Sequence, residues 1–359
     1  MKRYLILENN MVFEGEAFGA DKDSVAEIVF TTAMTGYVET LTDPSYTGQA
    51  VVQTFPLMGN YGVMLEDFEG NKISVSAYIV REYCENPSNF RLEKSIDEFL
   101  KEQGVPGIYG IDTRALTKIL REHGTMNGMI TSSPDKADMK EIKQYKASEP
   151  VGLVSTKETE HYETKNGYKV VLFDFGVKKN IIRCLQKKGC DVYAVPYNTT
   201  ADEVMAMSPD GIFLSNGPGD PVENTEVIKT IKQLMNKKIP TMGICLGHQL
   251  LALANGFSTT KLKYGHRGAN HSAKNTVTGK IYITSQNHGY AVMSESIDKN
   301  VAKEWFYNVN DRTNEGIIYN NSPCISVQFH PEACGGPHDT EFLFDEFIKL
   351  MGGNKNAEN

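Results

Sequence analysis

The residue best suited to chemistry in this sequence is Cys245, which follows an apolar run over residues 239–244 and precedes an alanine- and leucine-rich segment that ends near Gly256. With glycines at positions 243 and 247, this pattern predicts a strand, a sharp turn and a helix. A thiol at such a turn lies at a helix N-terminus, where backbone N–H groups and the helix dipole favour the thiolate. The arrangement matches the G-x-S-x-G elbow of hydrolases, with cysteine as the nucleophile. A buried structural cysteine is the alternative, and the short motif leaves both interpretations open.

A candidate general base is His330, which stands in the run Phe329-His330-Pro331-Glu332. Apolar residues at 325, 327 and 329 predict a strand, so His330 comes just where that strand ends. Pro331 stiffens the connection to Glu332, whose carboxylate can bind one imidazole nitrogen, fix the tautomer and leave the other nitrogen free to exchange protons. Cys245, His330 and Glu332 are therefore the predicted nucleophile, base and orienting carboxylate of an acyl-transfer site.

A third feature is the loop over residues 215–221, which follows a predicted strand ending at Leu214. Its glycines, Gly217 and Gly219, and its two prolines can hold the backbone N–H groups exposed, as a site for a developing oxyanion requires. A plain tight turn has the same composition, and for this loop alone it is the favoured interpretation.

The overall composition excludes several classes of function. Hydrophobic residues make up 40% of the chain and the net charge is −8, which suits a soluble globular protein and argues against binding nucleic acid. No apolar stretch is long enough to span a bilayer, and charges come too early for a signal peptide, so we expect no membrane association. The six cysteines form no C-x-x-C pair and no metal-ligand spacing. This predicts free thiols in the cytoplasm, no metal site and, because no phosphate-binding glycine motif occurs, no bound nucleotide.

The chain is predicted to be an α/β protein of two domains. Residues 1–150 mix strands, turn-rich loops and amphipathic helices, and residues 151–168 form a polar linker. Residues 169–352 alternate strands and helices, which predicts a mostly parallel sheet with helices on both faces and ligands at the carboxyl ends of its strands. The final third is predicted to hold shorter, antiparallel strands, and residues 353–359 a disordered tail.

The elbow, the loop and the His-Pro-Glu segment, in this order, resemble the class I (triad) glutamine amidotransferases. The N-terminal half is similar to the small, glutamine-hydrolysing subunit of carbamoyl-phosphate synthase in the segments 34–37, 41–46, 59–62 and 107–114. The resemblance covers nearly the whole chain, apart from the linker and the tail. It implies an N-terminal β/β/α swivelling-type domain and a flavodoxin-like C-terminal domain. One departure is Cys334-Gly335, where the family usually has a serine and a proline.

The resemblance also implies L-glutamine as the substrate. The Cys245 thiolate would attack its side-chain amide, His330 would protonate the departing ammonia and then activate water, and Glu332 would orient His330. The implied glutamine-binding residues are Ser45, Gly217, Gly219, Leu246, Gln249, Asn287, Gly289 and Tyr290. From the residues alone, a hairpin turn explains 287–289 equally well, and Ser45 is an ordinary turn residue.

The family further implies a partner, a large synthetase subunit that uses ATP and Mg²⁺ and receives ammonia through an internal tunnel. It would make carbamoyl phosphate from bicarbonate for pyrimidine and arginine synthesis, in a heterodimer or a higher oligomer of heterodimers. We expect no cofactor in this chain itself. A free-standing γ-glutamyl hydrolase or cysteine peptidase would explain the triad but would leave residues 1–150 without a role. A non-catalytic scaffold subunit is at odds with the intact Cys245, His330 and Glu332.

Overall fold

The computed structural model describes residues 1–356, with the side chains of residues 1–352. The chain forms two compact units, Met1–Pro150 and Val151–Asn359. Helix α5 (Pro150–Val154) and strand β10 (Glu160–Tyr162) lie in the stretch for which the sequence predicts a linker. This stretch belongs to the second unit, because Val151 is buried in that unit's core. No helix in the described part of the chain has the length and apolar character to cross a membrane.

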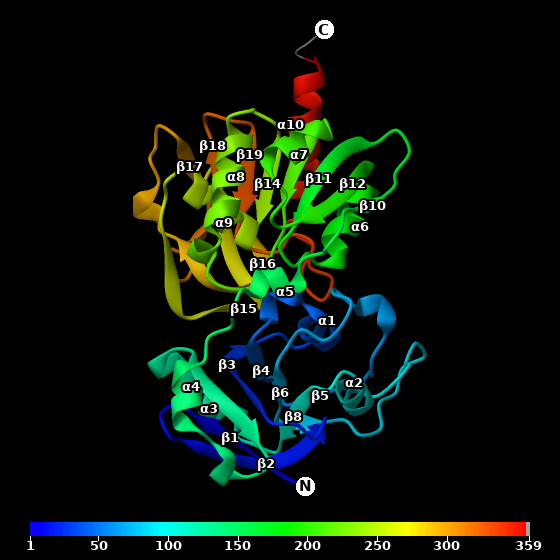
Figure 1. The fold of residues 1–359 in the computed structure, drawn as a ribbon, viewed down its shortest axis with the longest axis vertical. Helices are drawn as coiled ribbons and strands as arrows, with labels where there is room; N and C mark the ends of the chain where they lie inside the picture. Colours follow the sequence, from blue (N-terminus) through cyan, green and yellow to red (C-terminus); the bar gives the residue numbers. More distant parts are fainter. Residues whose placement is uncertain (357–359) are drawn as a thin grey trace. The chain divides into compact units, whose positions relative to one another are not determined.

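The first unit is built on a closed barrel in the strand order β1-β2-β8-β6-β4-β3-β9 (Figure 1). Its strands are β1 (Lys2–Leu7), β2 (Val12–Gly19), β3 (Ser24–Thr31), β4 (Gln49–Gln53), β6 (Ala77–Ile79), β8 (Pro106–Tyr109) and β9 (Met126–Thr131), with a separate pair β5 (Leu57–Met58) and β7 (Glu82–Tyr83). Its helices are α1 (Tyr37–Thr42), α2 (Ile96–Glu102), α3 (Thr113–His123) and α4 (Met139–Gln144), with 3-10 turns at Pro44–Tyr46, Leu65–Asp67 and Pro134–Lys136. Aromatic and aliphatic side chains, among them Tyr37, Tyr78 and Phe99, fill its main core. This architecture confirms the mixed α/β prediction for the N-terminal half.

The second unit is a 10-stranded sheet in the order β10-β12-β11-β13-β14-β19-β18-β17-β15-β16. Its strands after β10 are β11 (Tyr168–Asp174), β12 (Cys190–Pro196), β13 (Gly211–Leu214), β14 (Thr241–Ile244), β15 (Thr259–Asn275), β16 (Ile281–Val292), β17 (Ala302–Asn308), β18 (Asn314–Tyr319) and β19 (Cys324–Val327). The block β12-β11-β13-β14-β19 is parallel, and the remaining neighbours pair antiparallel. The predicted parallel sheet is therefore confirmed.

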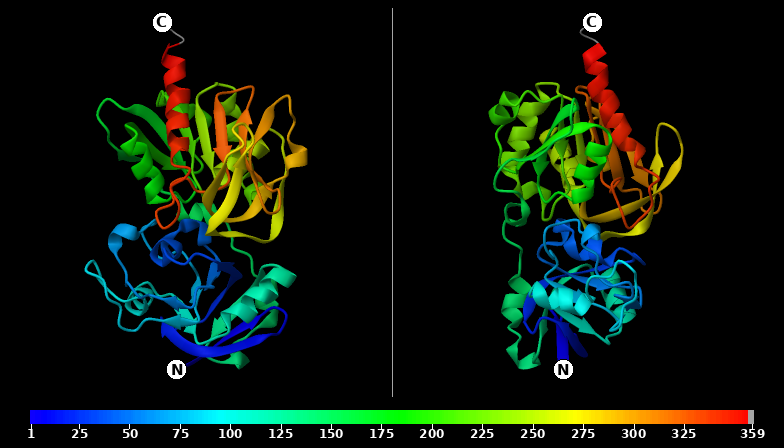
Figure 2. Two further views of the ribbon diagram at one scale, coloured as in Figure 1. Left: turned by 180° about the vertical axis from the view of Figure 1, so that it is seen from behind. Right: turned by 90° about the vertical axis from the view of Figure 1, so that its right-hand side faces the viewer.

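Helices cover both faces of this sheet, as the alternation of strands and helices predicts. They are α6 (Lys179–Lys187), α7 (Ala201–Ala206), α8 (Thr225–Met235), α9 (Leu246–Ala254) and α10 (Phe342–Asn356), with 3-10 turns at Pro221–Glu223 and Ser294–Ser296. One core joins one face of the sheet to α7, α8 and α9, and the other core joins the opposite face to α6 and α10. Helices α8 and α9 lie in front of the sheet in Figure 1, and α10 lies in front of it when the molecule is seen from behind (Figure 2).

Two segments of the second unit differ from the sequence prediction. Strands β15 and β16 are 17 and 12 residues long and form a bulged antiparallel hairpin, where short strands are expected. Polar and charged residues and glycines make up most of β15, so its sequence lacks the apolar alternation by which a half-buried strand is recognised. Helix α10 is assigned through Asn356, within the stretch predicted to be a disordered tail, and residues 357–359 lie outside the described part.

Candidate active site

Cys245 occupies a strained turn between β14 and α9. Its backbone has φ 53° and ψ −103°, and the residue is 3% exposed. Such angles are costly for a residue with a side chain and persist only where the surrounding structure enforces them. A Cβ at Gly243 would lie 2.8 Å from the carbonyl group of Gly247, and a Cβ at Gly247 would lie 2.2 Å from the carbonyl oxygen of Leu214. Only glycine fits at both positions, so the predicted strand–turn–helix elbow is confirmed.

Neighbouring parallel strands bring Cys245 and His330 to the same edge of the sheet. Ile244, the last residue of β14, pairs with Val327, the last residue of β19. Cys245 and His330 follow these residues, and carboxyl ends of parallel strands share one edge. The backbone N–H of His330 donates to the backbone carbonyl of Ser285 at 2.9 Å, which fixes the chain just beyond β19.

His330 and Glu332 form a buried pair. His330 Nδ1 donates to Glu332 Oε1 at 2.7 Å, and each residue is 1% exposed. Burial and the nearby Lys178 ammonium lower the pKa of His330, but the Glu332 charge and the Cys245 side chain outweigh them and raise it to about 10. Burial raises the pKa of Glu332, yet His330 and Lys178 hold it well below its usual range. Both shifts favour the charged forms, an imidazolium and a carboxylate.

The Cys245 side chain contributes to the high pKa of His330 both as a hydrogen-bond partner and through its charge. Because Nδ1 binds Glu332, only Nε2 is left to interact with Cys245. Among the described residues, Nε2 has no hydrogen-bond partner with good alignment. A long or poorly aligned contact is common between catalytic groups without substrate and tightens in the complex.

Sequence reasoning missed two residues beside Glu332. Lys178 Nζ lies 3.5 Å from Glu332 Oε1, and the Lys178 side chain is 11% exposed. The Asn180 side-chain amide donates to the backbone carbonyl of Glu332. Both residues follow the carboxyl end of β11, where polar side chains of a parallel sheet gather. That position was the available signal, and no motif marks them.

The loop after β13 lies against the elbow. A Cβ at Gly217 would lie 2.3 Å from the carbonyl oxygen of Phe175 and 2.8 Å from Leu246 Cδ2, so the backbone of this loop packs closely beside the start of α9. Gly219 has φ 92°, which a residue with a side chain rarely adopts. The N–H of Leu246 is the first of α9 and has no intrahelical acceptor. Backbone donors of the loop and of the helix thus lie near Cys245.

Strand β16 contains three of the predicted glutamine-binding residues, namely Asn287, Gly289 and Tyr290. The alternative of a hairpin turn over 287–289 is therefore wrong. The Cys245 thiol donates to the carbonyl oxygen of Asn287 at 3.6 Å. Gln249 Nε2 donates to the carbonyl of Tyr290 and to Gln328 Oε1, both at 2.9 Å. These contacts tie the elbow and its helix to β16.

Ser45 lies in the first unit, in the 3-10 turn Pro44–Tyr46. It is 9% exposed, and its N–H donates to Asp43 Oδ1 at 2.9 Å. The Asp43 cap accounts for the local turn without reference to a ligand. A role of Ser45 in binding glutamine stays a prediction.

His248 is next to the elbow but does not share the catalytic geometry. It is fully buried, and its Nδ1 lies 2.8 Å from Ser326 Oγ. Burial lowers the pKa of His248 to about 3, so the ring is neutral and packed in the interior. These contacts favour His330 as the base, as the sequence predicts.

Comparisons with known proteins match both units of the chain. Residues 5–130 match the carbamoyl-phosphate synthase small chain, CPSase domain, and residues 171–350 match the class-I glutamine amidotransferase domain. A carbamoyl phosphate synthase small chain of Fusobacterium nucleatum subsp. nucleatum is 50% identical over 98% of this chain and 99% of the relative. One from Bacillus anthracis is 49% identical over 98% of this chain and 96% of the relative. One from Listeria monocytogenes serotype 4b is 48% identical over 99% of both chains. The chain therefore belongs to the family of carbamoyl phosphate synthase small chains, which are glutamine-hydrolysing enzymes.

Proposed function

We propose that this chain hydrolyses L-glutamine through Cys245, His330 and Glu332 and passes the ammonia to a large, ATP-dependent synthetase subunit. The observation that carries the proposal is the buried His330, which is bound to Glu332 at 2.7 Å through one nitrogen and follows the strand that pairs with the one ending before Cys245. A charged imidazole beside a thiol at a helix N-terminus favours the thiolate, the reactive form of cysteine.

The reaction starts from the thiolate–imidazolium pair of Cys245 and His330. The thiolate attacks the amide carbon of glutamine and forms a tetrahedral oxyanion. His330 Nε2 gives its proton to the amide nitrogen, the C–N bond breaks, and ammonia leaves a thioester. The neutral imidazole then takes a proton from water, and the hydroxide attacks the thioester carbon. When the C–S bond breaks, glutamate leaves and the thiolate–imidazolium pair is restored.

The oxyanion is stabilised by backbone N–H groups of Gly217, Gly219 and Leu246. Support comes from the close packing of Gly217 against Leu246 and from the first N–H of α9, which has no acceptor within the helix. The α9 dipole favours the negative charge at the same place. Preorganised donors of this kind contribute about 3–4 kcal/mol each to the stability of the transition state.

The substrate's amino-acid end is bound by residues of β16 and α9. Asn287, Gly289 and Tyr290 lie on the strand whose backbone accepts the Cys245 thiol, and Gln249 is held in place by its two amide N–H bonds. The engaged amide nitrogen leaves Gln249 Oε1 as the atom that accepts from the substrate's ammonium group.

Release of ammonia requires an acceptor close by, because free ammonia is mostly protonated at neutral pH and is then not a nucleophile. The likeness to small chains of carbamoyl phosphate synthases supports a large partner subunit as this acceptor. ATP and Mg²⁺ would bind to that subunit, which uses bicarbonate and ammonia to make carbamoyl phosphate. No phosphate-binding glycine motif occurs in the present chain.

The test measures glutamate release by the purified chain alone and with its co-expressed large subunit. We expect a low rate alone, a strong rise with the partner, and complete loss in Cys245→Ala. Partner-independent hydrolysis of γ-glutamyl peptides would support the free-standing hydrolase instead. An unreactive thiol, measured by iodoacetamide labelling of Cys245, would overturn the catalytic proposal.

A further inference from the structure

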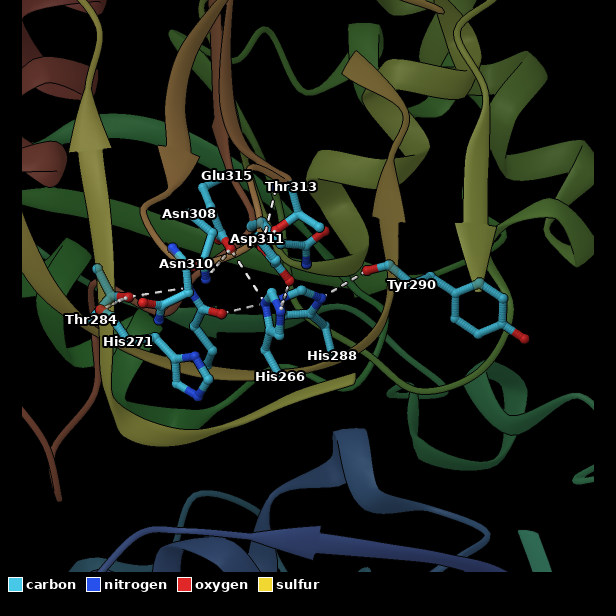
Figure 3. Close-up of polar contacts among 12 residues, drawn as sticks. His266, His271, Thr284, His288, Tyr290, Asn308, Asn310, Asp311, Thr313 and Glu315 are labelled. Carbon is cyan, nitrogen blue, oxygen red and sulfur yellow. Dashed lines mark hydrogen bonds and ion pairs between the residues drawn. The ribbon is translucent and has the colours of Figure 1, made fainter. Parts of the chain in front are cut away.

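A second group of chemically active side chains lies next to the proposed active site and has no part in its mechanism. His266 on β15, His288 on β16 and Glu315 on β18 offer donor atoms that all lie within 4.8 Å of one another. Figure 3 shows these three side chains converging from their strands, with Asp311 beside them. All three are buried, at 8%, 4% and 0% exposed.

His288 presents an unshared electron pair to this group. Its Nδ1 lies 2.8 Å from the carbonyl oxygen of Tyr290, which only accepts, so Nδ1 carries the proton of the neutral ring. Nε2 is then an acceptor, yet it lies 3.3 Å from another acceptor, Gln286 Oε1. With the Gln286 amide in this orientation, two acceptors face each other in the interior, an arrangement that a cation between them stabilises.

His266 is held in the complementary way. Its Nε2 donates to Asp311 Oδ2 at 2.7 Å. Its Nδ1 has no hydrogen-bond partner with good geometry among the described residues and lies 3.5 Å from Glu315 Oε1. Glu315 Oε1 accepts from Asn308 Nδ2 at 3.3 Å, and Glu315 Oε2 has no hydrogen-bond partner with good geometry in the described part of the chain. Metal-binding histidines characteristically bind a carboxylate or a backbone carbonyl through the ring nitrogen that faces away from the metal, and both histidines do so here.

We propose that His266, His288 and Glu315 bind a divalent transition-metal ion, zinc in the first place, with the Gln286 amide oxygen as the fourth neighbour. Tetrahedral zinc with bonds of about 2.0–2.1 Å has ligand–ligand separations of about 3.3–3.4 Å. His288 Nε2 lies 3.3 Å from Gln286 Oε1, and His266 Nδ1 lies 3.5 Å from Glu315 Oε1, both close to this value. The donors of His266, His288 and Glu315 all lie within 4.8 Å of one another. Imidazole and carboxylate ligands suit zinc, and a dication balances Asp311 and Glu315.

A proton on His266 would satisfy its Nδ1 and pair with Glu315. It would still leave His288 Nε2 opposite Gln286 Oε1, whereas a metal ion would bind His266, His288 and Glu315 together. A buried site closed by protein ligands is structural, not catalytic. It would fix β16 at residues 286 and 288, on either side of Asn287, whose carbonyl accepts the Cys245 thiol. This inference goes beyond the proposed function and stands independently of it.

The test measures zinc per chain by elemental mass spectrometry, on protein purified without chelator or metal-affinity tag. The Cys245→Ser background removes the reactive thiolate as a competing ligand. We expect about one zinc per chain, and in the cobalt-substituted protein the visible absorption of a tetrahedral site. His266→Asn and Glu315→Gln should lose the metal. Asp311→Asn keeps every ligand and should weaken zinc binding by about 10- to 100-fold.

His271→Asn is the matched control, because its ring lies 5.2 Å from that of His266 but lies outside the donor set. This variant should keep the metal in full. If circular dichroism shows that a ligand variant is unfolded, the cobalt spectrum of the parent protein and the zinc titration of Asp311→Asn decide whether the metal site exists. The proposal would be overturned if the protein stays free of zinc after dialysis against micromolar zinc, or if the ligand variants bind zinc equally well. The remaining interpretation would then be a protonated His266 between Asp311 and Glu315.

Discussion

Replacement of Glu332 by glutamine tests the catalytic pair directly. The substitution keeps the shape of the side chain but removes the charge that lies 2.7 Å from His330 Nδ1. For charge centres about 4 Å apart and an effective dielectric constant of about 20, the lost attraction is about 4 kcal/mol. At about 1.4 kcal/mol per pKa unit, the pKa of His330 would fall by about three from its raised value of about 10.

The sign of this change predicts the pH dependence. Glutaminase activity needs charged His330, so the high-pH limb of kcat/KM in the native enzyme reports its raised pKa. In Glu332→Gln that limb should move down by about three pH units, into the neutral range. With the loss of orientation added, kcat should fall by about 10²- to 10⁴-fold, less than in Cys245→Ala.

The assay is glutamate release by the complex between pH 6 and 10, on enzyme checked for folding by circular dichroism. Lys178 offers a matched rescue, because its ammonium lowers the pKa of His330. Lys178→Met in the Glu332→Gln background should raise that pKa again and return part of the high-pH activity. A Glu332→Gln profile with an unmoved high-pH limb and kcat within threefold of native would refute the imidazolium–carboxylate pair.

Three further outcomes are expected. Gly247→Ala places a Cβ 2.2 Å from the Leu214 carbonyl oxygen, so it should lower the denaturation midpoint and abolish glutaminase activity. Ala252→Gly, later on α9, removes a buried methyl group and should cost about 2 kcal/mol of stability but keep most activity. Native-like activity of Gly247→Ala would contradict the packing argument. Burial lowers the pKa of His248 to about 3, so at acidic pH the unfolded chain binds a proton that the native one excludes. As the pH falls from the unfolded pKa of about 6.5 to pH 3, the free energy of unfolding should drop by up to about 1.4 kcal/mol per pH unit. Urea titrations should show a shallower loss in His248→Gln, and equal slopes would argue against a neutral buried ring. Ser45→Ala should raise KM for glutamine and leave kcat nearly unchanged if the predicted binding role holds, and steady-state kinetics with an unaltered KM would remove Ser45 from the site.

Local patterns in the sequence were sufficient to predict the local structure around the candidate site residues. The elbow is specified by three local features: the glycines at 243 and 247, the apolar run before Cys245 and the helical segment after it. Each feature acts within a few residues. The same holds for His330 and Glu332, which Pro331 joins in one short segment. The alternation of strands and helices likewise predicts the parallel sheet with two helical layers.

Contacts between distant segments could not be predicted in this way. Lys178 reaches Glu332 because β11 and β19 lie in the same parallel sheet with their carboxyl ends at one edge. Strand β15 carries no clear strand pattern and owes its conformation to pairing with β16 and β17. Pairing and burial there outweigh the preferences of the individual residues.

The sequence by itself determined which groups are available for chemistry and the local turns that present them, since propensity, glycine geometry and capping act over short distances. Tertiary structure alone decided what surrounds those groups. The lysine that binds Glu332, the strand that accepts the Cys245 thiol, and the meeting of His266, His288 and Glu315 all depend on the register of strands far apart in the chain. Register is set by packing over the whole sheet, and no short segment encodes it.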